Sequence, residues 1–539
     1  MAVKWVGKVY DTMLIHHLVF PNFGKTGTDD DAKSTGAGHG LEFLSSQFCG
    51  KEPWKSEKTK GLEYYCCQDV DVTLQCYLEM IPILKELKLV DLYENVQVPL
   101  AKICHLMHKT GIKIDPNKIK DVRDKLLKEM EQLEKELPDS LRTRDIQINR
   151  RHPAPPGTLG KSGKPVKFIM VGDTERVSPW RSPTVKQRYL YSTEGDGLGL
   201  EPVINPKTEK ITTGKMALDR IYHKTKNPAV RALRKINVID ELITTFAKVE
   251  LVRVGRQYPH FNVHGTSTGR LSSSDPNLQN IPESARYMYV PSHAGWKIVS
   301  IDFSGIENRI QSYLAGDIDR SRRLEEKGFS EHKYLASKMS GLPMGEIEKS
   351  IDPDSDYSKA KHVVHGVDRG LGYLKASRMY DMDLKETKIL FDMWKKEIWP
   401  TIQWQNKIAE KAKLDGYLVN PFGRRAPFYT SNYYTTALSF LPQSSGADVI
   451  YRTMIGMLYK RIGWPEEKVR KAVRVYEAIP DNSTLLLQVH DELVFECAPD
   501  VVDNLIAVCQ RVMGQPWEEL GGMVIPLGIH VGDSWGEAG

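Results

Sequence analysis

The sequence lacks the features that mark secreted, disulfide-stabilised or membrane-spanning proteins. It has seven cysteines in 539 residues, and none forms a C-x-x-C pair. We therefore expect reduced thiols and no zinc site. No apolar run approaches the roughly 18 residues that a membrane-spanning helix needs, and the first residues lack a signal-peptide pattern. These absences indicate a protein of the cytoplasm with no membrane partner.

The sequence also lacks a large excess of positive or negative charge. The formal net charge is +6, with 27% charged and 40% hydrophobic residues. So small an excess permits nucleic-acid binding but does not demand it. A chain of this length is too long for one compact core, so several domains are expected.

Two apolar stretches that each end in an acid carry the strongest chemical signal. Residues 297–303 are apolar and β-branched, which favours a buried strand that delivers Asp302 at its end. Residues 485–496 predict a hairpin with Asp491 at its turn. If the two elements lie side by side, the two carboxylates meet and need a cation between them. The alternative is a pair of unrelated acids at strand ends.

The same stretches resemble known motifs. Asp-Phe-Ser-Gly-Ile-Glu-Asn-Arg at 302–309 and Gln-Val-His-Asp-Glu-Leu-Val-Phe-Glu at 488–496 are similar to the first and third polymerase motifs of family A DNA polymerases, the group of bacterial DNA polymerase I. The resemblance covers most of the chain. It implies an α+β fold shaped like a right hand, with a palm built on an antiparallel sheet, helical fingers and thumb, and a partial RNase H-like exonuclease domain in front.

This resemblance implies five parts along the chain. They are a partial 3′–5′ exonuclease-like domain (1–95), a thumb with an unassigned insertion (96–250), the first part of the palm (251–315), the fingers (316–410) and the second part of the palm (411–539). Asp115-Pro116 should open a long amphipathic thumb helix. The basic segment 142–167 predicts a loop that is either solvated or in contact with phosphate. Residues 528–538 resemble the usual end of the polymerase, so we expect it to finish there.

Tyr65 and Asp69 are similar to the third motif of the proofreading exonuclease of the family, Tyr-x-x-x-Asp. Such an exonuclease holds two metal ions with carboxylates from three motifs. Residues 10–14 resemble the part that follows the second motif, so the other carboxylates are expected before Met1. The resemblance then implies a chain without proofreading, or one half of a split polymerase and exonuclease.

Residues 261–282 form a polar segment that suits a DNA groove, because Arg, Asn and Gln can bond minor-groove acceptors common to every base pair. The segment closely resembles the family sequence that holds the primer–template. Together with the hairpin motif, the resemblance implies DNA contacts by Arg270, Gln279, Asn280, Gln488 and His490.

A spacing of four residues predicts one basic helix face that ends in an aromatic ring, formed by Lys361, His365, Arg369 and Tyr373. Taken alone, this could be an exposed cationic stripe. Its likeness to the fingers helix implies a triphosphate site instead, with His332 as a second contact. Lysine and histidine at the first two positions are similar to phage members of the family, which favours a viral origin and the host cytoplasm. Arg369 stands where the family has an aromatic residue, so stacking on the nucleotide is not carried over to this position.

The resemblance as a whole implies a DNA-templated DNA polymerase. Two Mg²⁺ ions would be held by Asp302 and Asp491, and His365 would protonate the departing pyrophosphate. Glu492 would support the metal site or play a structural role. Glu307 would exclude a ribose 2′-hydroxyl, or be a salt-bridged helix acid. The expected partners are primer–template DNA, deoxynucleoside triphosphates and replisome proteins. The alternative is a primer–template-binding protein that has lost catalysis.

Overall fold

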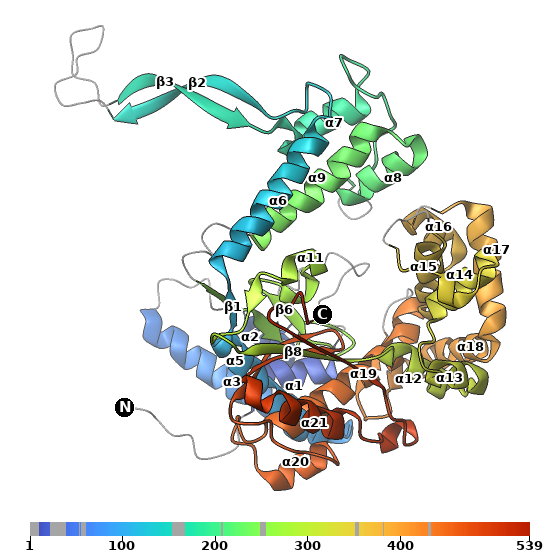
Figure 1. Cartoon of the computed structure of the whole chain (residues 1–539). Coiled ribbons are helices and arrows are strands. Elements are labelled where there is room, and N and C mark those ends of the chain that lie inside the picture. Colours follow the sequence, from blue (N-terminus) through green and yellow to red (C-terminus); the bar gives the residue numbers. More distant parts are fainter. Residues whose placement is uncertain are drawn as a thin grey trace. The chain divides into compact units, whose positions relative to one another are not determined.

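The structure, a computed structural model of the whole chain, describes residues 10–21, 39–52, 54, 61–153, 168–205, 209–247, 255–350, 355–380, 382–428 and 433–538 (Figure 1). The chain divides into two compact units, one made of residues 1–119 and 249–539 and the other of residues 120–248. Many helices and a few small sheets confirm the predicted α+β class. Within the described ranges, no helix is both long enough and apolar enough to cross a bilayer.

The first unit is built on a four-stranded antiparallel sheet with the order β11-β12-β8-β13. These strands are β8 (Lys297–Phe303), β11 (Ser483–Val489), β12 (Glu492–Cys497) and β13 (Leu527–Gly532). The apolar run of β8 is almost wholly buried, as expected for an inner strand covered on both faces. Helix α21 (Val502–Met513) packs on β8 and β13, and α5 (Val98–Thr110) contacts β11.

The predicted hairpin with Asp491 at its turn is confirmed. Strands β11 and β12 pair up to Val489 and Glu492, which leaves His490 and Asp491 as a two-residue turn. His490 has a φ of 56°, in the left-handed region that such tight hairpin turns use. Gly423-Arg-Arg425, within residues 416–428, predicts a second hairpin with a basic turn, and β9 (Tyr417–Val419) and β10 (Arg425–Pro427) form it.

The predicted fingers region is helical, as expected. Its helices are α13 (Ile318–Glu325), α14 (Glu331–Ser340), α15 (Asp356–Asp368), α16 (Tyr373–Tyr380), α17 (Leu384–Glu397) and α18 (Trp399–Asp415). All of them except α13 contribute to an apolar core in which Val363, Phe391 and Trp394 are fully buried. Helix α12 (Ile306–Ala315) follows β8 directly and leads from the sheet to this bundle (Figure 1).

The prediction of one continuous helix face from Lys361 to Tyr373 is wrong. Helix α15 ends at Asp368, Arg369 caps it, and Tyr373 opens the next helix. The cause is Gly370, whose φ of 70° is the left-handed conformation that commonly terminates helices at glycine.

After Pro442, the polar segment Gln443–Asp448 predicts the start of a helix, and this prediction is wrong. Helix α19 runs from Tyr434 to Leu458, so this segment lies in its interior, after Pro442. Nearly every residue from Ala437 onward is buried. Burial of a long apolar helix therefore outweighs the local signal of proline and serines, which usually marks a helix start.

The second unit contains most of α6 (Pro116–Glu134), together with β2 (Arg144–Pro153), β3 (Phe168–Val177), α7 (Pro183–Tyr191), α8 (Lys215–Thr225) and α9 (Pro228–Thr245). Its apolar core includes Trp180, Leu218 and Leu233. The long helix after Asp115 is confirmed. The loop prediction for 142–167 is wrong at 144–153, which pair with β3 as an antiparallel ribbon, while 154–167 lie outside the described residues. The alternation Arg-Asp-Ile-Gln-Ile at 144–148 is a strand signal that the basic composition obscured.

The described part of residues 10–95 is helical and contains no strand. Its helices are α1 (Thr12–Val19), α2 (Leu41–Phe48), α3 (Gly61–Glu86) and α4 (Val90–Leu92), and a π-helical turn, η2 (Tyr93–Gln97), leads into α5. Tyr65 and Asp69 both lie on α3. The exonuclease-like character of this part, and the five-part division of the chain, stay predictions.

Candidate active site

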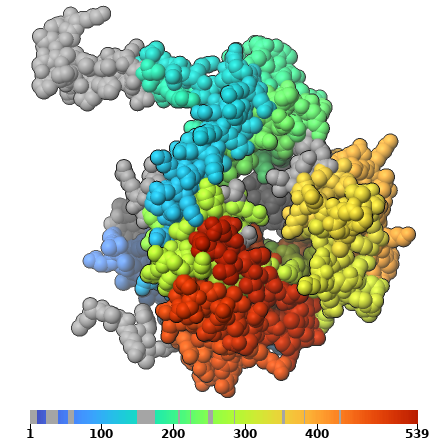
Figure 2. Space-filling view, in the orientation of Figure 1, coloured from blue at the N-terminus to red at the C-terminus, as the bar shows by residue number. Residues whose placement is uncertain are grey.

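Asp302 and Asp491 come together at one end of the four-stranded sheet. Asp302 is the last but one residue of β8, and Asp491 belongs to the turn between β11 and β12. The backbone N–H of Phe303 donates to the carbonyl oxygen of Asp491 at 3.1 Å, which fastens the turn to the strand end. In Figure 2 the surface of the first unit is hollowed between its yellow and its red parts.

The surroundings of both carboxyl groups disfavour the charged, deprotonated form. Burial is the main reason that the pKa of Asp491 is raised to about 6, and the charges of Asp302 and Glu307 raise it further. Burial likewise raises the pKa of Asp302, with His530 opposing the rise and Glu492 adding to it. Two buried acids that oppose each other's ionisation favour a bound cation.

This donor set fits Mg²⁺. Asp302 and Asp491 are the two carboxylates that the chain brings together here. Within the described ranges, no three His, Cys, Asp or Glu side chains cluster as a metal site. Mg²⁺ is commonly bound by one or two carboxylates, with substrate phosphates and water as its other ligands. There is also room for the carboxylate of Asp302, because the residue paired with it on β13 is Gly528. A Cβ at that position would overlap Oδ1 of Asp302.

Glu492 pairs with Asp302 across the strands, but its own carboxylate is engaged. Oε1 accepts hydrogen bonds from Ser300 at 2.6 Å and from Trp535 at 2.9 Å. Oε2 accepts from Arg286 at 3.3 Å, whose guanidinium lies 4.5 Å from the ring centroid of Trp535. Three donors thus fix Glu492 beside Asp302, which favours a supporting role over direct ligation.

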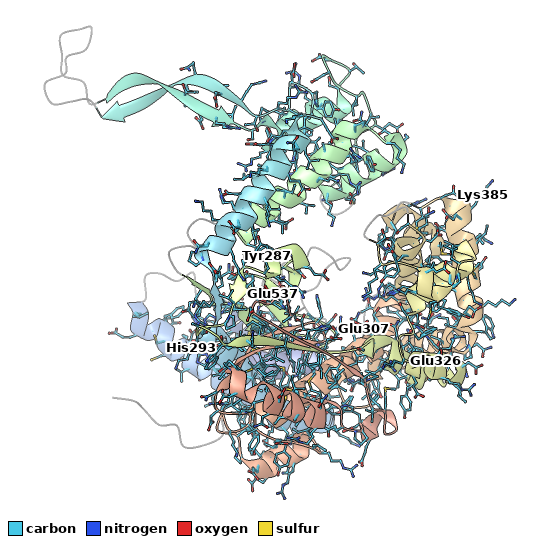
Figure 3. The ribbon with its side chains drawn as sticks, in the orientation of Figure 1. Tyr287, His293, Glu307, Glu326, Lys385 and Glu537 are labelled. Carbon is cyan, nitrogen blue, oxygen red and sulfur yellow. The ribbon has the colours of Figure 1, made fainter. Side chains whose placement is uncertain are left out.

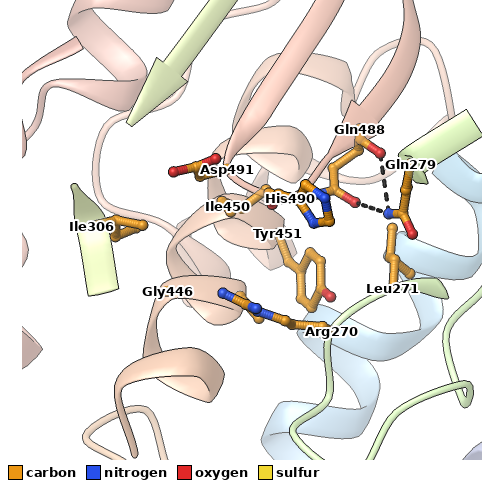
Figure 4. A pocket seen from close by; sticks show the side chains of 11 residues that line it. Arg270, Leu271, Gln279, Ile306, Gly446, Ile450, Tyr451, Gln488, His490 and Asp491 are labelled. Carbon is orange, nitrogen blue, oxygen red and sulfur yellow. Dashed lines mark hydrogen bonds between the residues drawn. The ribbon is translucent and has the colours of Figure 1, made fainter. Parts of the chain in front are cut away.

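A pocket opens beside Asp491 (Figure 4). Its lining comprises Arg270, Leu271, Gln279, Ile306, Gly446, Ala447, Ile450, Tyr451, Gln488, His490 and Asp491. The amide nitrogen of Gln279 donates to the backbone oxygen of Gln488 at 3.2 Å and to its side-chain oxygen at 3.1 Å. Four of the predicted DNA contacts therefore line one pocket, and Asn280 is exposed on the adjoining turn.

Glu307, which is labelled in Figure 3, lies at the start of α12 and faces two arginines. Arg270 donates to its carboxylate, and Nη2 of Arg369 lies 3.7 Å from it. Burial raises the pKa of Glu307, but the two arginines outweigh burial and lower it below its usual range. The salt-bridged alternative for this residue is therefore observed, while its role as a sugar gate stays a prediction.

His332 and His365 face each other with ring centroids 4.9 Å apart. Burial is the main cause that lowers the pKa of His365 to about 4, followed by His332. Burial lowers the pKa of His332 to about 4 as well, although Glu331 opposes it. Both rings are therefore neutral near pH 7. Nε2 of His332 is buried and has no hydrogen-bond partner, and Lys361 is exposed. Tyr373 packs on the core of the helical bundle.

Comparison with known proteins identifies the family. The sequence profile of DNA polymerase family A matches residues 181–537. The chain belongs to DNA polymerase family A. It is 28% identical over 476 residues to the thermostable DNA polymerase I of Thermus filiformis, covering 85% of this chain and 49% of that protein. It is 26% identical over 569 residues to DNA polymerase I of Bacillus subtilis, covering 100% of this chain and 57% of that protein.

A solved structure supports the fold of this family A chain. The POL domain of Pol1 from M. smegmatis, in complex with DNA primer-template and dNTP, matches with a TM-score of 0.69 and 22% identity, over 98% of this chain and 82% of that chain. The family A chain spans about half the length of the curated relatives it matches.

Sequence reasoning missed three parts of the site in this family A chain. Gly528 makes room for Asp302, and Arg286 and Trp535 hold Glu492. Gly528 and Trp535 lie in the segment that resembles the end of the polymerase, so a strand paired to β8 could have been sought there. Arg286 follows a polar segment and gave no signal of its own.

Proposed function

We propose that the chain is a template-directed DNA polymerase that adds deoxynucleotides to the 3′ end of a primer. The observation that carries the proposal is the convergence of Asp302 and Asp491 beside a pocket lined by Arg270, Gln279 and Gln488. Membership of family A supports it. So does the fold shared with a polymerase domain whose structure holds primer-template DNA and dNTP.

In this proposal Asp302 and Asp491 hold two Mg²⁺ ions, which when bound would activate the primer 3′-hydroxyl and stabilise charge on the transferred phosphate. Glu492 keeps Asp302 in place. Lys361 and the unpartnered Nε2 of His332 bind the triphosphate.

His365 is neutral before the nucleotide binds, because burial depresses its pKa. Phosphate oxygens beside the ring favour its protonated form. In that form the ring can donate a proton to the departing pyrophosphate.

The remaining predicted contacts select the substrates. Arg270, Gln279, Gln488 and His490 line the pocket that would take the primer–template, and Asn280 is exposed on the adjoining turn. Glu307 excludes a 2′-hydroxyl, so deoxynucleotides are the substrate. Arg369 borders the nucleotide, and Tyr373 approaches the new base pair from the start of α16.

Three finer assignments extend the proposal. A role in phage replication, in the host cytoplasm and with replisome proteins, is supported by the pair Lys361 and His365, whereas the relatives described above are bacterial. Absence of proofreading is supported by the single exonuclease-like motif, Tyr65 and Asp69. In the alternative, a separate polypeptide completes the exonuclease, and Tyr65 and Asp69 are the part of it that this chain supplies.

Primer extension with Mg²⁺ and four deoxynucleotides tests the proposal. Asp302→Asn or Asp491→Asn should nearly abolish extension and leave primer–template binding intact, because each removes ligand charge without changing shape. Asp319→Asn is the control, since that side chain is 83% exposed on α13, and it should extend like the wild type. Extension within about tenfold of the wild type in the two site variants would rule out the assignment. A wild-type chain that binds primer–template without extending it would favour the binding-protein alternative.

A further inference from the structure

Arg320, on α13, is a buried cation to which the proposed chemistry assigns no task. Its side chain is 0% exposed. Nε and Nη2 donate to the two carboxylate oxygens of Glu331 at 2.7 and 3.1 Å. Nη2 also donates to Asp368 at 2.8 Å, and Nη1 donates to Gln311 at 3.0 Å. Arg320 thus binds three side chains from three other helices, α12, α14 and α15.

Further hydrogen bonds fasten the same helices. The amide of Asn308, on α12, donates to Glu331. The carbonyl oxygen of Asp368 accepts from Gln311 at 2.7 Å and from Gln405 of α18 at 2.9 Å. The end of α15, where the helix stops and Arg369 begins, is therefore fixed to α12 and α18.

Three members of this network are chain neighbours of predicted substrate contacts. The neighbouring pairs are Asn308 with Glu307, Glu331 with His332, and Asp368 with Arg369. Because adjacent residues share a backbone, fixing the first member of a pair limits where the second can lie. We propose that Arg320 is a positioning residue for the incoming nucleotide, acting through these pairs. The proposal rests on the proposed polymerase function.

The charge balance of the network argues against a purely stabilising role. One guanidinium faces two buried carboxylates, and Oδ1 of Asp368 has no hydrogen-bond partner. Burial raises the pKa of Asp368 to about 6, with Arg320 opposing the rise and Glu331 adding to it. Apolar residues of similar size often stabilise a core as well as a buried ionic cluster does. What the cluster adds is fixed geometry, since a planar guanidinium binds its partners in set directions.

A matched control lies in the same group of helices and shares α13 and α14 with the Arg320 network. Glu397, on α17, accepts from Lys338 at 2.5 Å and from Tyr334 at 2.9 Å, both on α14. Arg323 of α13 lies 3.7 Å from it. Glu397 therefore also joins α13, α14 and α17, but neither residue beside it in the chain is a predicted substrate contact.

The test compares Arg320→Lys with Glu397→Gln in steady-state nucleotide incorporation by the full chain. Lysine keeps the charge but lacks the fork that reaches three partners at once. We expect Arg320→Lys to raise the KM for the deoxynucleotide about tenfold or more, with the Kd for primer–template within about twofold of wild type. Glu397→Gln should leave both constants unchanged, and both variants should lower the melting temperature. If Arg320→Lys does not fold, Glu331→Gln replaces it, because its amide opposes the donors of Arg320 and Asn308.

The possible outcomes distinguish the positioning role of Arg320 from the proposed polymerase function. A raised KM with unchanged primer–template affinity in the network variants alone would support the positioning role. An unchanged KM in a network variant that extends primers would overturn that role and leave the proposed function standing. A wild-type chain that adds no nucleotide would overturn the proposed function, and the positioning role with it.

Discussion

Asp302 owes its position to the residue that faces it on the neighbouring strand. A Cβ built on Gly528 would overlap Oδ1 of Asp302 and lie 3.0 Å from its Cγ. Such contacts are not tolerated, so one of the two groups would have to move. The carboxylate keeps its place because residue 528 has no side chain.

Gly528→Ala should therefore reduce nucleotide incorporation about 100-fold, since small displacements of a catalytic group have effects of that size. Asp302 can rotate away from the new methyl group, so the melting temperature should change little. Gly345→Ala is the control, because a Cβ there meets nothing within 4 Å. Incorporation by Gly528→Ala within about threefold of wild type would show that Asp302 does not need this space.

His365 gives the site a pH dependence. Burial holds its pKa at about 4 in the free protein, and triphosphate raises that pKa by favouring imidazolium. The complex then binds one proton more than the free protein, so nucleotide affinity falls as pH rises. We expect the KM for the deoxynucleotide to increase between pH 6 and pH 8 by up to about tenfold per unit.

His365→Lys should remove this dependence and keep activity, since lysine stays charged throughout that range. Titration of the nucleotide itself appears in both proteins and cancels in the comparison. Arg369 also places a positive charge near the triphosphate. The pH profiles with histidine and with lysine at position 365 should therefore be compared again in an Arg369→Tyr background. Identical profiles with histidine and lysine would mean that His365 takes up no proton on binding.

Helices and strands were predicted correctly where the local sequence pattern was strong. Predictions failed where backbone conformation or contacts between distant residues determine the structure. The apolar run of β8 and the hairpin around Asp491 were both predicted, and with them the meeting of the two acids. The break after Asp368 was missed because residue spacing alone does not show that Gly370 takes a left-handed conformation. The Arg320 network could not be predicted, since its acidic partners lie 11 and 48 residues away in the sequence and no local pattern pairs them with an arginine.

Helix α3 carries the exonuclease-like residues, but its acids have other partners. Asp69 accepts from Nε1 of Trp54 at 3.0 Å, and Asp71 forms an ion pair with Lys51 at 2.5 Å. We expect no 3′–5′ shortening of a labelled mismatched primer by this chain with Mg²⁺ and no deoxynucleotides. Asp69→Ala should behave like the wild type.

Shortening that disappears in Asp69→Ala would contradict this expectation and show an intact exonuclease. Shortening that appears only after a second polypeptide is added would identify a split enzyme. A polymerase assay on the same preparation confirms that the chain is folded.

For the whole molecule, the net charge of +6 is small, so DNA binding should depend on where positive charge is gathered. Binding to phosphates releases counterions and weakens as salt rises. We expect the affinity for primer–template to fall steeply between about 50 and 200 mM salt, as measured by fluorescence anisotropy. Arg270→Ala should impair extension more than binding, because one contact positions the primer but adds little to total affinity. Binding independent of salt would contradict this view.

The second unit lies in the sequence between the two segments of the first unit, which affects the order in which the parts can fold. Strand β1 (Ile112–Ile114) pairs with β4 (Arg256–Gln257), so all of residues 120–248 leave the ribosome between the two partners. Until residue 257 has been made, β1 lacks this neighbour. The second unit has its own core, and Arg123 bonds the carbonyl of Ala247 at 3.1 Å, close to its two ends. Once folded, it closes most of the loop and lowers the entropy lost when β1 meets β4.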